Sequence, residues 1–259
     1  MMEIFSTEIR EKFDKYTTHV PISTFSFSIH ISLQHGYLYT DTPKVCSTTI
    51  KNSLHRLELG DPAFRLENAE QLHERIRSPL LLPCQVGDFD KLIRSHKIFK
   101  FCFSRNPYAR LLSAYLDKIK PGTFQTKGLI DFLGSEKYSI SKQFSFDEFV
   151  NIVCDQPISE MNMHWRVQYY QTYQDTISYD FLGKMENFEN DFIEVFRRIN
   201  ADHGCFAASE RAHSTDASEL LSKYYTPQLI KMVEEKFTKD FEFFGYDSAT
   251  SVTRKVIST

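Results

Sequence analysis

The chain has 259 residues, 41% of them hydrophobic and 25% charged, as is typical of a soluble globular protein with one large domain. Its formal net charge of -3, from 31 basic and 34 acidic residues, argues against nucleic acid as a partner but is compatible with a local basic site for a small anion. Five cysteines without a CxxC pair favour reduced thiols over a disulfide framework. The first 20 residues lack the apolar core of a signal peptide, and no run of about 18 apolar residues occurs. We therefore expect a cytoplasmic protein without a membrane span.

Helices and strands are expected to alternate along the chain. In chain order we expect a helix over 1–20, strands over 23–33 and 36–42, helices over 48–59, 61–77 and 86–96, a strand over 97–105, helices over 106–119 and 145–154, a strand over 176–185, and helices over 186–200 and 226–246. Apolar residues at every second position over 25–33 predict the first strand. Asn106 before Pro107, and Ser145 three residues before Glu148, are typical helix starts. This order predicts an α/β fold, a P-loop-like three-layer arrangement whose central, mainly parallel sheet is flanked by helices.

The stretch YLYTDTPKVCSTTIKNSLHRLE, residues 37–58, predicts a strand, a short loop and a helix. Unpaired N–H groups and the helix dipole at such a helix start favour an anion, for which Lys44 adds a charge. Ser47, Thr48 and Thr49 add hydroxyl donors. The loop has no glycine and does not match the nucleotide-binding pattern GxxxxGK(S/T). In the alternative interpretation, Ser47 or Thr48 only caps the helix and Lys44 is a solvated surface lysine.

The stretch FCFSRNPYARLLSAYLDK, residues 101–118, has the same strand-to-helix organisation. Arg105 ends the predicted strand and can bind a phosphate through two parallel hydrogen bonds. Ser113 follows eight residues later on the helix, where a serine usually faces solvent or bonds to its own helix. Two strand-end anion sites together would suit a ligand with two anionic ends.

Taken together, the two stretches resemble the sulfotransferases that use PAPS (3′-phosphoadenosine 5′-phosphosulfate), in particular the branch with many carbohydrate O-sulfotransferases. That family's 5′-phosphosulfate loop reads Pro-Lys-x-(Gly/Ala)-(Cys/Gly)-Thr-(Ser/Thr); TPKVCSTTIK matches it at Pro43 and Lys44 and departs from it at Cys46 and Ser47. The 3′-phosphate motif reads roughly RDP(F/Y)xRLxSxY, which SRNPYARLLSAY matches except at Asn106. Later segments follow the family's order, so the resemblance covers about residues 36 to 247. It implies a single domain over 1–259, with an N-terminal extension over 1–22 and an acceptor-side insertion over 120–175.

The resemblance implies that this sequence binds PAPS through residues of both motifs and of a later loop. These residues are Lys44, Val45, Cys46, Ser47, Thr48, Thr49, Arg105, Ser113, Arg211 and Ser214. Lys44 would contact the oxygen that bridges phosphate and sulfate, where charge develops as the sulfuryl group leaves. Arg105 and Ser113 would bind the 3′-phosphate, whereas Arg110 would be a structural ion-pair residue.

The acceptor hydroxyl needs a general base, and histidine suits that role near neutral pH. The resemblance favours His164, because the family carries a His-Trp pair in the corresponding segment; in the alternative, its ring only orders the loop. His35, just before the strand that leads to the first motif, is the second candidate. Further candidates are His30, His213 and the carboxylate Glu160. Trp165, the only tryptophan, is expected in the core.

The resemblance implies an in-line displacement that releases PAP, with no metal ion, since a sulfuryl group carries less charge than a phosphoryl group. The acceptor would be a hydroxyl, or an amine, of a sugar, a glycolipid precursor or another small molecule. A P-loop-type kinase or NTPase is an alternative, although the chain lacks the glycine-rich loop. A catalytically silent nucleotide-binding protein is another, against which the presence of Lys44, Arg105 and Ser113 argues.

Overall fold

The computed structural model of the protein describes residues 6–66, 71–134, 142–207, 217 and 220–247. The chain divides into two compact units, the first formed by Met1–Ser104 with Thr172–Ala212 and the second by Arg105–Gln171 with His213–Thr259. The predicted domain boundaries stay a prediction. Residues 1–22, expected to be an extension, contribute Phe13 and Tyr16 to a core cluster of the first unit.

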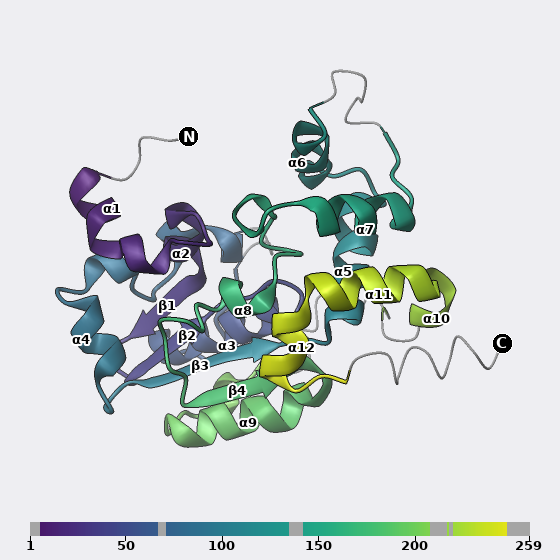
Figure 1. The fold of residues 1–259 in the computed structure, drawn as a ribbon. Helices are drawn as coiled ribbons and strands as arrows, with labels where there is room; N and C mark the ends of the chain where they lie inside the picture. The colour runs from purple at the N-terminus through teal and green to yellow at the C-terminus, as the bar shows by residue number, and fades with distance from the viewer. Residues whose placement is uncertain (1–5, 67–70, 135–141, 208–216, 218–219, 248–259) are drawn as a thin grey trace. The chain divides into compact units, whose positions relative to one another are not determined.

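The first unit is built on a four-stranded sheet in the order β1-β2-β3-β4, which Figure 1 shows with its helices. The strands are β1 (Ile29–Ser32), β2 (Tyr37–Thr40), β3 (Phe99–Ser104) and β4 (Phe181–Lys184). Only β1 runs antiparallel to its neighbour, and β2, β3 and β4 are parallel, with Thr40 opposite Cys102 and Ser104 opposite Lys184. The sheet confirms the predicted α/β class and its mainly parallel order.

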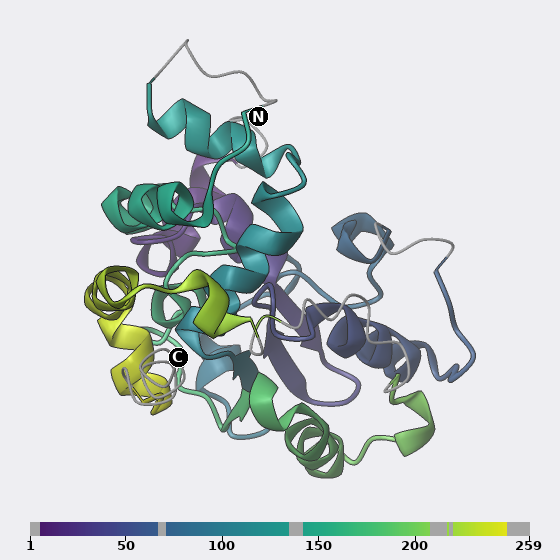
Figure 2. The same ribbon diagram turned by 90° about the vertical axis from the view of Figure 1, so that its right-hand side faces the viewer.

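Helices cover both faces of this sheet, because the side chains of each strand alternate between the faces. Its helices are α1 (Thr7–Phe13), α2 (Ile22–Ser28), α3 (Ser47–Leu59), α4 (Phe89–Arg94) and α9 (Phe188–Arg198). On one face, Tyr39 and Phe101 pack in one core cluster with α3 and α9; on the other, Leu38 packs in a separate cluster with α1, α2 and α4. Figure 2 shows the same strands turned by 90°, with the green helix α9 beside them.

The described residues of the second unit form helices joined by loops, and no strand occurs among them. Its helices are α5 (Pro107–Ala114), continued by a π-helical turn over Tyr115–Ile119, then α6 (Gln125–Phe132), α7 (Phe146–Asp155), α8 (Gln168–Gln171), α10 (Leu221–Tyr224), α11 (Pro227–Lys236) and α12 (Thr238–Phe244). Their core is rich in aromatic side chains, including Tyr108, Phe149, Trp165 and Tyr225. Trp165 is 1% exposed and donates its indole N–H to Gln156, so its expected place in the core is confirmed.

Three secondary-structure predictions were wrong in part, each because tertiary contacts outweigh the local pattern. Residues 23–28 belong to α2 and only Ile29–Ser32 to a strand; Ser28 is buried and bonds the carbonyl of Phe25, whereas Phe27 is only half-buried. In the described residues 61–66 and 71–77 of the helix predicted over 61–77, short 3₁₀ turns form at Gln71–His73 and Arg75–Arg77 in place of an α-helix. A side chain competes for the backbone there, since Arg56 Nε donates to the carbonyl of Phe64. The helix expected over 226–246 is interrupted at the buried Phe237, between α11 and α12.

Candidate active site

The first motif forms a left-handed loop between β2 and α3. Lys44 and Cys46 have φ angles of 74° and 63°, and α3 begins at the next residue, Ser47. No hydrogen-bond partner among the described residues pairs with the backbone N–H groups of Ser47 and Thr48. Because α3 is 13 residues long, its dipole adds partial positive charge at these N–H groups. The loop therefore offers hydrogen-bond donors and positive potential to an anion. Lys44, three residues before Ser47 in the sequence, is half-buried.

A buried ion pair fixes both ends of this loop. Lys51, in the second turn of α3, holds its ammonium 3.0 Å from the carboxylate of Asp41, which directly follows β2, and both side chains are at most 2% exposed. Tyr39 donates its hydroxyl to the same carboxylate at 3.1 Å, and the N–H of Asp41 donates to the carbonyl of Ser28 at 2.7 Å. Neither Asp41 nor Lys51 was singled out in the sequence. The available signal was that Lys51 lies on the buried face of the predicted helix, three residues before Leu54.

Cys46 occupies the position at which the sulfotransferase motif has glycine or alanine, and its left-handed backbone, at φ 63°, explains why glycine suits this position. A left-handed conformation costs a residue with a Cβ atom about 1–2 kcal/mol. We expect Cys46→Gly to leave stability unchanged or raise it slightly, because relief of that strain exceeds the roughly 0.4–1 kcal/mol of unfolded-state entropy that glycine adds. We expect Cys46→Val to lower stability by at least about 1 kcal/mol, since a branched Cβ fits this region poorly. Urea unfolding of both variants would check this, and equal stability of the two would contradict it.

His55, on the buried side of α3, belongs to a buried polar cluster. Ser78 accepts a hydrogen bond from Arg75 at 3.2 Å, so its single hydroxyl proton is left to donate to Nε2 of His55 at 3.1 Å. Burial, and then the charges of Lys51 and Arg75, lower the pKa of His55 from 6.5 to about 4. The native protein therefore keeps this ring neutral well below the pH at which an unfolded histidine takes up a proton.

Acidification should consequently weaken the fold through His55. Between pH 6.5 and 4 only the unfolded state binds this proton, so the free energy of unfolding falls as the pH falls, by up to about 3 kcal/mol at 1.36 kcal/mol per pKa unit. In urea titrations at pH 7 and pH 4.5, the His55→Gln variant should lose less stability than the wild type. An equal loss of stability in both proteins would rule out His55 as a source of the acid sensitivity.

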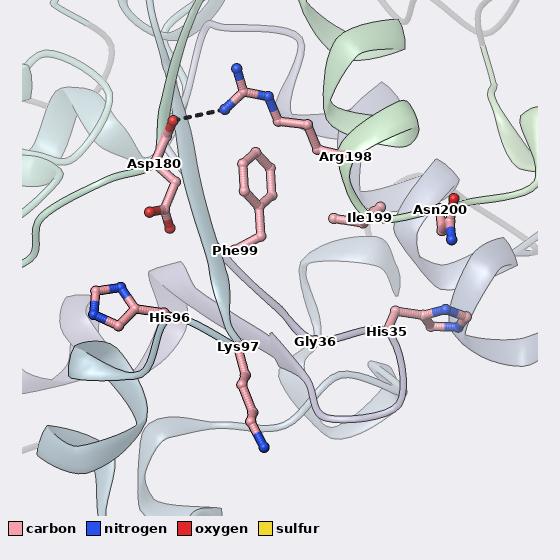
Figure 3. Close-up of a pocket in the computed structure, with 9 residues that line it drawn as sticks. All are labelled: His35, Gly36, His96, Lys97, Phe99, Asp180, Arg198, Ile199 and Asn200. Carbon is pink, nitrogen blue, oxygen red and sulfur yellow. Dashed lines mark hydrogen bonds between the residues drawn. The ribbon is translucent and has the colours of Figure 1, made fainter.

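His35 lies at the end of β2 opposite Lys44, since it precedes Tyr37 whereas the loop follows Thr40. It lines a cavity of about 430 Å³ at the amino ends of the parallel strands, together with Phe99 and Asp180. Figure 3 shows that the side chains of its lining residues diverge, and that Arg198 bonds to the carbonyl of Asp180 beside the Phe99 ring. The structure does not bring His35 to the loop.

The second motif begins α5 of the second unit as its sequence predicts. Asn106 accepts hydrogen bonds from the N–H groups of Tyr108 and Ala109, and Pro107 occupies the first helical position. Arg105 and Ser113 are 6% and 2% exposed. Both backbone groups of Arg105 bond to the side-chain amide of Gln168, a residue that sequence reasoning missed.

Arg110, expected to be structural, holds the segment that carries His164. Its guanidinium donates to the carbonyls of Arg166 at 2.7 Å and Met163 at 3.0 Å. His164 is half-buried, and Nδ1 of its ring lies 2.7 Å from Oδ1 of Asn162, which also accepts the N–H of His164. Because that oxygen is an acceptor, Nδ1 carries the proton and the neutral ring has its lone pair on Nε2.

Of the other candidates, His30 is buried in β1, where its Nδ1 lies 2.6 Å from Nη1 of Arg75, and the rest are exposed or undescribed. Glu160 is exposed, in a 3₁₀ turn. Arg211, His213 and Ser214 lie outside the described residues. Within the described parts of the chain, no three His, Cys, Asp or Glu side chains are grouped to hold a metal ion, and no helix is both long and apolar enough to span a bilayer.

Comparison with known proteins finds one family whose model covers both motifs. A family model described as "Sulfotransferase family" matches residues 28–247. The chain is 29% identical over 238 residues to carbohydrate sulfotransferase 14 of Danio rerio, an alignment that covers 87% of this chain and 64% of that protein. It is 26% identical over 256 residues to carbohydrate sulfotransferase 12 of Mus musculus, covering 85% and 60% of the two chains. It is 24% identical over 267 residues to carbohydrate sulfotransferase 10 of Pongo abelii, covering 95% and 74%.

The chain thus spans less than two thirds of the length of carbohydrate sulfotransferases 14 and 12. No solved structure matches it significantly. Since the family model covers 28–247 of the 259 residues, the chain belongs to the sulfotransferase family.

Proposed function

We propose that this chain is a PAPS-dependent sulfotransferase that moves the sulfuryl group to a hydroxyl of a sugar. The observation that carries the proposal is the loop before α3, at the carboxyl end of a parallel strand. It contains left-handed residues, Lys44, and N–H groups of Ser47 and Thr48 with which no described residue pairs. Membership of the sulfotransferase family and the carbohydrate sulfotransferases among its relatives support the reaction and the acceptor class.

The 5′-phosphosulfate end fits the donor groups of this loop. The N–H groups of Ser47 and Thr48 need acceptors, and phosphate oxygens would supply them. The hydroxyls at 47–49 add further donors. Lys44 would place its charge at the bridging oxygen, where negative charge grows only as the bond to sulfur breaks, so its contribution is greatest in the transition state. The single charge of a sulfuryl group makes this set sufficient without a metal ion.

The 3′-phosphate would bind Arg105 and Ser113, which come from the strand exit and from the helix that follows it. Arginine recognises a phosphate through two parallel hydrogen bonds, which fix both its distance and its orientation. Binding both anionic ends would distinguish PAPS from nucleotides that lack a 3′-phosphate.

His164 would be the general base. With Nδ1 donating to Asn162, Nε2 carries the lone pair that could accept the proton of the acceptor hydroxyl. His35 is at the wrong end of β2 to meet Lys44, and we do not assign it a role in the reaction. An amine in place of the hydroxyl would use the same base.

The donor is tested by ligand-induced stabilisation. PAP should raise the melting temperature and ATP–Mg should not, because only PAP carries the 3′-phosphate. Transfer of labelled sulfate from PAPS to a panel of saccharides then tests catalysis. Stabilisation by ATP–Mg alone would favour a kinase or NTPase, whereas stabilisation by PAP without transfer to any acceptor would favour a catalytically silent protein.

A further inference from the structure

We infer that Gln168 and Asp240 are positioning residues that hold Arg105 in the orientation for binding phosphate. The inference rests on the proposed function, since it takes Arg105 as a ligand of the 3′-phosphate. Nothing in either motif points to these two residues, which lie 63 and 135 positions beyond Arg105 in the sequence.

The backbone of Arg105 lies where regular hydrogen bonding ends. The strand stops at Ser104 and α5 starts at Pro107, so Arg105 belongs to neither element. The residue is only 6% exposed, and buried backbone groups must find partners. Asn106 caps the helix with its side chain, which accepts the N–H groups of Tyr108 and Ala109.

Gln168 bonds both backbone groups of Arg105 with one side chain. Its Oε1 accepts the N–H of Arg105 at 2.9 Å, and its Nε2 donates to the carbonyl of Arg105 at 2.8 Å. Gln168 is fully buried. Two hydrogen bonds to one residue fix both its position and its rotation, and therefore the direction in which the arginine side chain leaves the backbone.

Asp240 determines which way the Gln168 amide faces. Its Oδ2 accepts the backbone N–H of Gln168 at 2.9 Å and lies 3.4 Å from Nε2, while Oδ1 accepts the N–H of Tyr169 at 2.7 Å. A carboxylate oxygen only accepts, so it faces the NH₂ side of the amide and leaves Oε1 for Arg105. Figure 1 shows α8, which begins at Gln168, next to α12, which carries Asp240.

A fully buried carboxylate is costly to maintain. Burial raises the pKa of Asp240 to about 6, and these donors and the nearby charge of Arg110 offset only part of that rise. The whole arrangement holds one backbone segment, the one that bears the proposed phosphate ligand. Loss of the two hydrogen bonds from Gln168 to the backbone of Arg105 should therefore weaken donor binding, although no group proposed to contact the donor is removed.

The experiment is a double-mutant cycle on PAP affinity, measured by isothermal titration calorimetry. Gln168→Leu should weaken PAP binding about tenfold, the equivalent of one to two net hydrogen bonds. It should raise KM for PAPS by a similar factor while changing kcat little. In the Arg105→Ala background the same change should have almost no further effect, because the residue being positioned is gone. Gln125→Leu is the matched control, a buried glutamine of α6 that bonds to Thr123, and it should leave PAP affinity unchanged.

Equal weakening by Gln168→Leu in both backgrounds, or none in either, overturns the positioning role. If Arg105→Ala leaves PAP affinity intact, the phosphate assignment of Arg105 falls and the positioning role with it, although PAP binding itself still supports the proposed function. If Gln168→Leu does not fold, Asp240→Asn keeps the side-chain volume and frees the amide to turn over. It should weaken PAP binding in the same direction, again only when Arg105 is present, and an undiminished affinity would overturn the role.

Discussion

Replacing Lys44 with alanine should nearly abolish sulfuryl transfer, with kcat reduced by about 10²–10³-fold, and leave the fold intact. The lysine is proposed to meet charge that develops on the leaving oxygen, and removal of one such electrostatic group typically lowers kcat by about 10²–10³-fold. Its backbone is left-handed, at φ 74°, but alanine and lysine carry the same Cβ strain, so the substitution should not change the loop conformation. Turnover with labelled PAPS and thermal melting measure the two effects separately.

Lys231→Ala provides the matched control, because Lys231 lies on α11 with a side chain that is 78% exposed and a long contact of 3.8 Å to Glu235. This variant should keep wild-type turnover. PAP should still bind the Lys44→Ala protein, with modest loss, since the proposed interaction is strongest in the transition state. Near-normal turnover of Lys44→Ala would remove this residue from the chemistry and weaken the whole assignment of the loop.

Lys51→Met should destabilise the fold by about 3–5 kcal/mol, the usual cost of leaving one partner of a buried ion pair uncompensated. The substitution removes the ammonium group from the buried carboxylate of Asp41, which is at most 2% exposed and also accepts a hydrogen bond from the hydroxyl of Tyr39. Because Asp41 and Lys51 lie on either side of the loop between β2 and α3, PAPS binding should weaken together with stability. Urea unfolding and PAP titration of the same protein would measure both.

The double variant Asp41→Asn with Lys51→Met tests the reason for that loss. It removes both charges while an amide oxygen can still accept from Tyr39, so it should be more stable than Lys51→Met alone. A double variant as unstable as the single one would show that packing of the lysine chain, not the buried charge, accounts for the effect.

Local features of the sequence were sufficient to predict several helix starts and the loop between β2 and α3. The start of α5 follows from Asn106 and Pro107, and the start of α7 from the capping box of Ser145 with Glu148, because a helix cap joins residues two or three positions apart. The loop between β2 and α3 also follows from local sequence, since a strand, a turn and a helix start occupy consecutive residues. The sequence by itself therefore determined the α/β class, the two motifs and the family.

Only the tertiary structure decided what supports those motifs. Gln168 reaches Arg105 across 63 residues and Asp240 reaches Gln168 across 72, and no periodicity relates positions so far apart. The same holds for residues 23–28, whose alternating pattern suits a strand but whose buried Ser28, bonded to Tyr173, lies in a helix. His35 shows that closeness in the sequence does not predict closeness in space. It is nine residues from Lys44 in the chain, yet the intervening strand β2 places the two at opposite ends of the sheet. Sequence proximity identifies groups that act on neighbouring backbone, whereas packing decides which distant side chains meet.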